Sequence, residues 1–371
     1  MCAHRNRRNA AQMMFYIIGF LVLILTIFAN LKPQQRRLPA GKSPWTAEKI
    51  GILLTAAALG LILILQSADS NGDLTRYNTS YDKMALREFS YFQNNWNRMK
   101  DPLYYFCAFI FSQLGFSFFA WKALISVVFV IAVYKLILGY SANVSISYIA
   151  LITLGLFGFS LSGLRQMIAF SVILFAYPYL REHKLIKFML MVLIAGAFHS
   201  TAWICIFMYP IYRFKANTRN VLLLLGISIP VLLNINKLMR LYLSLTGTAD
   251  IYEDYLKQDG GLSAMGLVIW GSIWLFCTVF LYRRKSNALD PRLCNLLLVS
   301  FVLRIVSVTA YANFFRIAMY FSVFNCLVVA DACACKEEST FMVRLKTLGV
   351  SVALLLYYFV APNANILTYT V

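Results

Sequence analysis

The sequence has little charge, and acidic residues are especially scarce. Only 13% of its 371 residues are charged and 60% are apolar, which excludes an ordinary soluble domain. Acids are nearly absent from the long apolar runs; Asp331 stands at the end of one. Ion-coupled transporters usually need carboxylates or unwound carbonyls near the membrane centre, so this scarcity disfavours them.

Motifs of several large enzyme classes are also missing. The chain has no P-loop, GxGxxG, HExxH or GxSxG pattern. The eight cysteines are scattered, and Cys333 and Cys335 lie too close together for a zinc pair, with no histidine nearby. We therefore expect no disulfide framework, no metal and no cofactor. The net charge of +19 is spread over short loops, which argues against nucleic acid as a partner.

What the sequence does have is a series of long apolar runs along its whole length. The runs that are long enough to cross a bilayer, or nearly so, are 11–29, 50–65, 117–139, 144–158, 163–180, 220–236, 262–282, 293–310, 314–332 and 345–361. They predict an all-α polytopic membrane protein with about ten transmembrane helices in one domain, 1–371. The aromatic stretch 102–114 is short and predicts an interfacial or re-entrant helix.

Lys and Arg in the loops predict the orientation of the chain. Net positive charge marks the segments 30–49, 181–187, 213–219, 283–292 and 333–346. By contrast, 66–101 is neutral and 237–261 slightly acidic, so these two are expected to be outer loops. The assignment puts the N-terminus outside, against the charge of the basic residues at positions 5, 7 and 8.

The stretch 185–212 fits this topology if it enters and leaves on the cytoplasmic side. It then forms a re-entrant hairpin of two short helices with His199 at its tip. The alternative is one long tilted helix that leaves His199 near the middle of the membrane.

Three basic residues inside apolar segments are expected at the outer side of the membrane: Arg165, His199 and Arg316. Arg165 and Gln166 open one helix, where guanidinium, amide and helix dipole together suit a phosphate group. Arg316 opens another helix, and Arg304 lies at a similar depth one helix earlier. Converging arginines repel unless an anion joins them, which predicts a diphosphate site. The alternatives are snorkelling for Arg165 and pairing with carbonyls or tyrosine hydroxyls for Arg304.

His199 and Asp73 are the two candidates for a general base. An imidazole titrates near neutral pH, as proton transfer requires, although a structural hydrogen bond closing the hairpin tip is the usual role of a lone histidine. Asp73 follows Asn71-Gly72, which favours an ordinary turn aspartate. Tyr77 and Trp96 are candidates for stacking on sugar rings, although an interfacial aromatic belt is the commoner explanation.

These motifs resemble the EpsG family, which belongs with the Wzy-like bacterial polysaccharide polymerases. The resemblance rests on four features in order: Gly72-Asp73 with Tyr77, Leu164-Arg165-Gln166, Ala197-Phe198-His199-Ser200-Thr201-Ala202, and Arg316 with Tyr320-Phe321. Family members commonly carry an arginine shortly before Gly-Asp, whereas this chain has Gln66-Ser67-Ala68-Asp69 there.

The resemblance implies polymerisation of undecaprenyl-diphosphate-linked repeat units into exopolysaccharide, capsule or O-antigen. It also implies the outer face of the bacterial cytoplasmic membrane as the location and a chain-length regulator as a partner. In this interpretation Arg165 and Arg316 bind the diphosphate, and His199 or Asp73 is the base. The alternatives are a glycan ligase, a membrane O-acyltransferase that modifies surface glycan, and a lipid-linked glycan flippase.

Overall fold

The computed structural model describes residues 2–31, 47–96, 99–215, 217–246, 264–283, 290–309, 314–333 and 339–360. Within these ranges every regular element is a helix and no strand occurs, so the predicted all-α class is confirmed. The first helices are α1 (Cys2–Leu31), α2 (Ala47–Leu65), α3 (Gly72–Ala85), α4 (Phe89–Asn95), α5 (Pro102–Gln113), α6 (Phe118–Tyr140), α7 (Val144–Thr153), α8 (Leu156–Ser160) and α9 (Leu164–Arg181). They are followed by α10 (Leu185–Phe198), the 3₁₀ helix η2 (Ser200–Phe207), α11 (Met208–Arg213), α12 (Thr218–Leu233), α13 (Ile235–Thr246), α15 (Ala264–Arg283), α16 (Leu293–Thr309), α17 (Phe314–Ser322), α18 (Asn325–Cys333) and α19 (Thr340–Val360).

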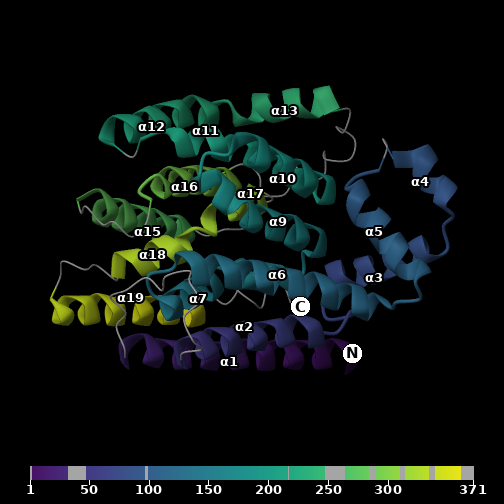
Figure 1. The fold of residues 1–371 in the computed structure, drawn as a ribbon, viewed down its shortest axis with the longest axis horizontal. Helices are drawn as coiled ribbons and strands as arrows, with labels where there is room; N and C mark the ends of the chain where they lie inside the picture. The colour runs from purple at the N-terminus through teal and green to yellow at the C-terminus, as the bar shows by residue number, and fades with distance from the viewer. Residues whose placement is uncertain are drawn as a thin grey trace.

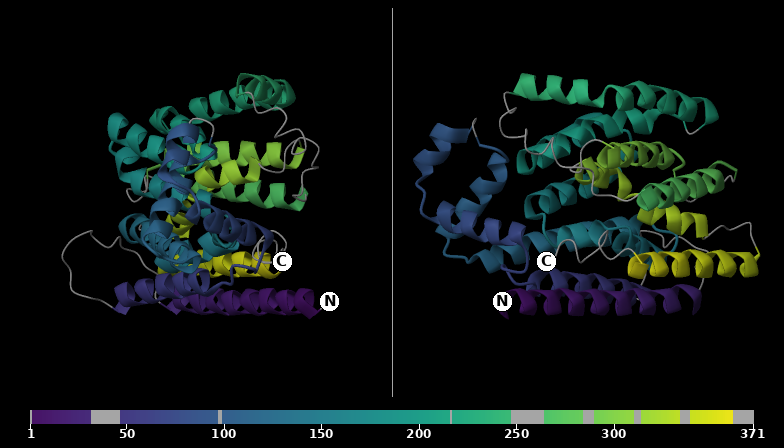
Figure 2. Two further views of the ribbon diagram at one scale, coloured as in Figure 1. Left: turned by 90° about the vertical axis from the view of Figure 1, so that its right-hand side faces the viewer. Right: turned by 180° about the vertical axis from the view of Figure 1, so that it is seen from behind.

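Most of these helices lie side by side in one bundle (Figure 1). At its centre α9 packs against α6 and α10, while α2 packs on α6 and α1 on α19. Helices α1 and α2 form one outer layer, and α12 with α13 forms the opposite one (Figures 1 and 2). Helices α3, α4 and α5 gather beyond one end of the bundle, which we call the site end. Helix α1 begins at this end too.

The core is apolar, and small polar side chains in it bond to backbone carbonyls. Every residue of α18 is buried, and so is nearly every residue of α7. Where these two helices meet, the Ser147 hydroxyl donates to the Cys326 carbonyl over 2.8 Å. Small residues with such hydroxyl bonds are typical of helix contacts inside membranes. Large apolar residues of α1, including Tyr16, Phe20 and Phe28, are exposed, as expected of a surface that faces lipid.

Fewer helices are long enough to cross a membrane than the sequence pattern predicts. Among the described residues, three helical stretches are long and apolar enough to span: Gln12–Asn30, Phe118–Tyr140 and Thr340–Val360. Helices α17 and α18 add a fourth if the pair, bent by 43°, is one broken span. Every predicted apolar run contains a helix, but several of these helices are only 10–17 residues long. The chain is a helical membrane protein, and about ten crossings stays a prediction.

The hairpin predicted for 185–212 is present. Helix α10 ends at Phe198, His199 is extended (φ −157°, ψ 119°), and η2 and α11 return along α10. At the open end of the hairpin the Tyr209 hydroxyl donates to the His183 carbonyl over 2.9 Å. The alternative of one long tilted helix is therefore wrong. The hairpin delivers His199 to the site end.

The placement of 66–101 and 237–261 on the outer side stays a prediction. Segment 66–101 contains α3 and α4, and Asn71 caps α3 by accepting from the Leu74 amide over 2.9 Å. Asp73 thus stands in the first turn of a helix, and not in a free turn. Of segment 237–261, the part up to residue 246 continues α13, and the rest lies outside the described residues. The predicted interfacial helix at 102–114 corresponds to α5.

Candidate functional site

The centre of the site is Asp101, a residue that the sequence analysis did not single out. Its carboxylate is fully buried, forms one ion pair and accepts two hydrogen bonds. Oδ2 is paired with Arg165 Nη1 at 2.9 Å and accepts from His199 Nδ1 at 3.0 Å, and Oδ1 accepts from the Ser200 amide at 2.8 Å. One side chain therefore joins the start of α9 to the tip of the α10–η2 hairpin.

The backbone of Asp101 is held in an uncommon conformation. Its φ of 60° and ψ of 52° lie in the left-handed region, which costs a non-glycine residue energy. Pro102 follows and opens α5, and a residue before proline ordinarily prefers extended backbone. Strain of this kind persists where the surroundings fix the residue, and it gathers at functional sites. The two hydrogen bonds and the ion pair of the carboxylate hold the Asp101 side chain here.

The charge state of Asp101 follows from its neighbours. Burial by itself would raise its pKa, but the hydrogen bond and charge of His199, the charge of Arg165 and the Ser200 amide together hold the pKa below its usual range. Asp101 is therefore a carboxylate at neutral pH. Because a carboxylate only accepts hydrogen bonds, Nδ1 of His199 must carry a proton toward it. In the neutral imidazole this leaves Nε2 free to accept a proton.

Arg165 lies in the first turn of α9 between two tyrosines. Its Nε is 3.5 Å from the Tyr77 hydroxyl and its Nη1 is 3.4 Å from the Tyr105 hydroxyl. The guanidinium carbon is also 5.4 Å and 5.7 Å from the centroids of these two rings. The Arg165 side chain keeps 22% of its surface exposed, so it is oriented by Asp101 and the tyrosines yet stays accessible.

A second arginine, Arg316, meets Asp73 beside this group. Their Nη2 and Oδ2 atoms are 3.5 Å apart, and both side chains are about one third exposed. Gln166 donates to the Arg316 carbonyl over 2.7 Å, which links the first turns of α9 and α17. In the described part of the chain, Arg316 Nε and Gln166 Oε1 are buried without a hydrogen-bond partner. Buried polar atoms left in this state are places where a ligand or water can bind.

Close packing at the start of α9 depends on a glycine. A Cβ on Gly163 would come 2.7 Å from the ring of Phe159. That ring lies 6.0 Å from Phe315 and 5.6 Å from the Arg316 guanidinium carbon. Gly163 therefore leaves room for the Phe159 ring that packs beside Arg316.

The structure thus brings together Asp73, Tyr77, Arg165, Gln166, His199 and Arg316 from the sequence analysis. The electrostatic expectation changes, because Arg165 and Arg316 do not face each other unpaired: each has a carboxylate partner. The first turns of α3, α9 and α17 and the start of α5 meet here. Helix N-termini carry partial positive charge, so their convergence favours an anion in addition to the two arginines.

The remaining two predicted site residues are directed to other partners. Arg304 is buried, with its guanidinium carbon 3.4 Å from the Trp270 ring centroid and its Nη2 3.5 Å from Met319 Sδ. Trp96 packs edge-on against Phe106 near the end of α4. The turn between α16 and α17 lies outside the described residues.

Asp101 had one signal in the sequence: an acid between Lys100 and Pro102, ahead of an aromatic helix. An Asp-Pro pair usually marks a turn, and no local sequence feature predicts that the Asp101 carboxylate will be buried. In the part of the chain that the structure describes, no group of three or more His, Cys, Asp or Glu is arranged to hold a metal ion.

Comparison with known proteins agrees with the motifs that surround this site. The model of the EpsG family matches residues 51–371, which is most of the chain and includes every site residue above. This chain belongs to the EpsG family. EpsG proteins are Wzy-like polysaccharide polymerases, so the protein belongs to polysaccharide biosynthesis. No curated protein and no solved structure matches the chain.

Proposed function

We propose that this EpsG-family protein joins lipid-diphosphate-linked oligosaccharide repeat units into a surface polysaccharide at the outer face of the bacterial cytoplasmic membrane. The observation that supports this most is the meeting of Arg165, Arg316 and His199 at the N-termini of several helices. Cations for a diphosphate and a base for a hydroxyl are the two things that glycosyl transfer from a lipid diphosphate needs.

In the proposed reaction a hydroxyl of one repeat unit attacks the anomeric carbon of the glycan on the other lipid. A new C–O bond forms as the bond between the anomeric carbon and the diphosphate oxygen breaks. The bonding electrons leave with the lipid diphosphate, and the hydroxyl proton passes to His199 Nε2. Arg165 and Arg316 meet the charge that develops on the leaving group.

The roles of the two carboxylates follow from their contacts. Asp101 is a positioning residue that orients His199 through Nδ1 and Arg165 through Nη1. Asp73 is paired with Arg316 and partly exposed, which makes it a weaker candidate for the base than His199. We therefore assign the base to His199 and the placement of Arg316 to Asp73.

The experiment compares surface glycan on a gel after deletion of the gene and complementation with wild type, Arg165→Ala or His199→Ala. A polymerase predicts single repeat units after deletion and a full ladder restored by wild type alone. A wild-type ladder from Arg165→Ala at normal protein levels would contradict the proposal. An unchanged ladder with altered acyl content would indicate an acyltransferase. Loss of all surface glycan, with lipid-linked units retained inside, would indicate a flippase.

The family also implies a chain-length regulator as a partner. Co-purification of such a protein with the full chain, together with a change of ladder length when it is deleted, would test this part of the proposal separately.

A further inference from the structure

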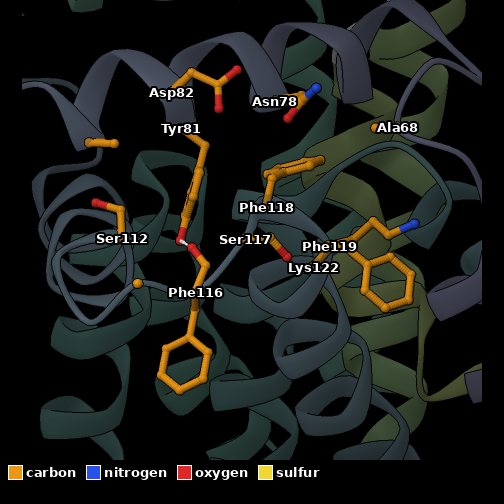
Figure 3. Close-up of a pocket in the computed structure, with 12 residues that line it drawn as sticks. Ala68, Asn78, Tyr81, Asp82, Ser112, Phe116, Ser117, Phe118, Phe119 and Lys122 are labelled. Atoms are coloured by element: carbon orange, nitrogen blue, oxygen red, sulfur yellow. Dashed lines mark hydrogen bonds between the residues drawn. The ribbon is translucent and has the colours of Figure 1, made fainter.

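A second concave surface lies at the site end, between α3 and the connection from α5 to α6 (Figure 3). It is an open groove of about 610 Å³. Its walls include Asn78, Tyr81 and Asp82 from α3, and Phe116, Phe119 and Lys122 from the start of α6 and the turn before it. The volume is in the range of small-molecule sites. None of these six residues belongs to the group around Asp101.

The groove has aromatic rings at its rim and a fixed tyrosine inside. Phe119 is 54% exposed and Phe116 49% exposed. Tyr81 is buried, and its hydroxyl donates to the Phe116 carbonyl over 2.7 Å, which ties α3 to the turn before α6 (Figure 3). Exposed rings beside a rigid wall offer flat apolar surface for the C–H face of a sugar ring.

The lining of the groove includes a buried lysine. Lys122 is only 2% exposed and stands in the apolar helix α6. A buried charge in such a helix is costly and usually functional. Its Nζ donates to the Gln66 carbonyl and lies 5.8 Å from the centroid of the Phe119 ring. Within the described residues these are its polar and ring contacts, so two of the three N–H groups of the ammonium have no protein acceptor.

The polar groups at the rim distinguish a neutral ligand from an anionic one. Asp82 and Asn78 offer acceptors, and the carboxylate of Asp82 would repel a phosphate headgroup. A sugar carries hydroxyls that donate to those acceptors and oxygens that accept from Lys122. The combination therefore fits a neutral, hydroxyl-rich saccharide better than a lipid headgroup.

Helix α3 contributes residues both to the groove and to the group around Asp101. Tyr81 of the groove stands four residues after Tyr77 of the group around Asp101, on the same face of α3 and about 6 Å along the helix axis. An oligosaccharide of a few sugar rings covers such a distance. A glycan seated in the groove could thus reach the group around Asp101 along α3.

We propose that this groove binds a saccharide unit of the acceptor glycan, with Phe119 stacking on a sugar ring and Lys122 donating to its oxygens. The inference rests on the proposed polymerase function, because it assigns the groove to one of the two substrates of that reaction.

The test measures binding without catalysis. The full chain in nanodiscs is titrated with the repeat-unit oligosaccharide of its host, released from its lipid by mild acid. Wild type should bind, and Phe119→Ala should weaken binding about three- to tenfold, the loss expected for one aromatic contact. Lys122→Met, which keeps the length of the side chain and removes the donors, should weaken binding as well. Phe119 is exposed, so its variant should fold even if the Lys122 variant does not.

The matched control is Phe89→Ala, because Phe89 is 53% exposed at the same end but packs on Phe106 outside the groove. Equal binding by wild type and Phe119→Ala would overturn the inference, and so would an equal loss from Phe89→Ala. Binding of glycerol phosphate but not of the oligosaccharide would indicate a headgroup site and overturn it too. Arg165→Ala should bind the oligosaccharide normally and lose the ladder. A normal ladder from Arg165→Ala would contradict the proposed function, whereas the measured binding of the oligosaccharide to the groove would still stand.

Discussion

Asp101 Oδ2 lies 3.0 Å from His199 Nδ1, although 98 residues separate the two positions in the chain. The same oxygen forms an ion pair with Arg165 Nη1 at 2.9 Å. A buried carboxylate in this place fixes the direction of the imidazole and of the guanidinium together. The proposed base and the proposed diphosphate ligand are therefore coupled through one residue.

Asp101→Asn should reduce polymerisation about 100-fold or more, because the amide can present its N–H₂ to His199 and favour the wrong tautomer. The measurement is the rate of polymer formation from lipid-linked repeat units with purified protein, recorded across pH. A positioning role predicts that the acidic limb of the rate profile, where the proposed base His199 becomes protonated, moves as well. Asp69→Asn, at an exposed aspartate just before α3, is the control and should change neither quantity.

The stability of the protein should depend on Asp101 at acid pH. Its pKa is lowered in the folded protein, so its contribution is fully present above the unfolded pKa of about 3.9. The contribution is lost as the pH falls through the lower, folded value. Thermal unfolding of wild type and Asp101→Asn in detergent should therefore give curves whose difference shrinks below about pH 4. A constant difference from pH 7 down to pH 3 would contradict the assignment.

Arg316→Ala should abolish the ladder with little loss of stability. Its ion pair with Asp73 is about one third exposed at each partner, and exposed pairs contribute only about 0–1 kcal/mol. A large effect on activity would then reflect contact with the substrate. The control is Arg219→Ala, an exposed arginine in the first turn of α12. A normal ladder from Arg316→Ala would remove Arg316 from the diphosphate site.

Gly196→Ala tests the hairpin that carries His199. The added Cβ would come 2.5 Å from the indole of Trp203, a rigid ring that must move to make room. We expect a loss of about 1–3 kcal/mol in stability and reduced activity. Gly226→Ala in α12 meets nothing within 4 Å, so it should be neutral or slightly stabilising. Similar melting temperatures for the two variants would show that the hairpin tip has room for a methyl group beside Trp203.

The re-entrant path of the hairpin can be tested by labelling single cysteines, after the eight native ones are replaced by alanine. Lys187→Cys and Lys215→Cys should react only when a thiol reagent reaches the cytoplasm, whereas Asp69→Cys should react from outside. All three positions are exposed. Labelling of positions 187 and 215 from opposite sides would contradict a hairpin, and a retained ladder shows that the cysteine-free protein works.

The sequence by itself determined the helical membrane class and the hairpin, because apolar periodicity and loop charge are local properties of the chain. It also placed Arg165, His199 and Arg316 at one end, since the orientation of each helix follows from its flanking loops. The prediction was incomplete where partners come from distant segments. Arg304 looks much like Arg316 in sequence, yet it stacks on Trp270.

Only the tertiary structure decided the burial and the partners of Asp101. Whether a carboxylate is buried, and which cations meet it, depends on how α5, α9 and the hairpin pack, and no local pattern carries that information. The pairing of Arg316 with Asp73 and the groove above Lys122 depend on packing in the same way. The local sequence determines side-chain chemistry and helix direction, whereas burial and electrostatic pairing depend on how separate helices pack together.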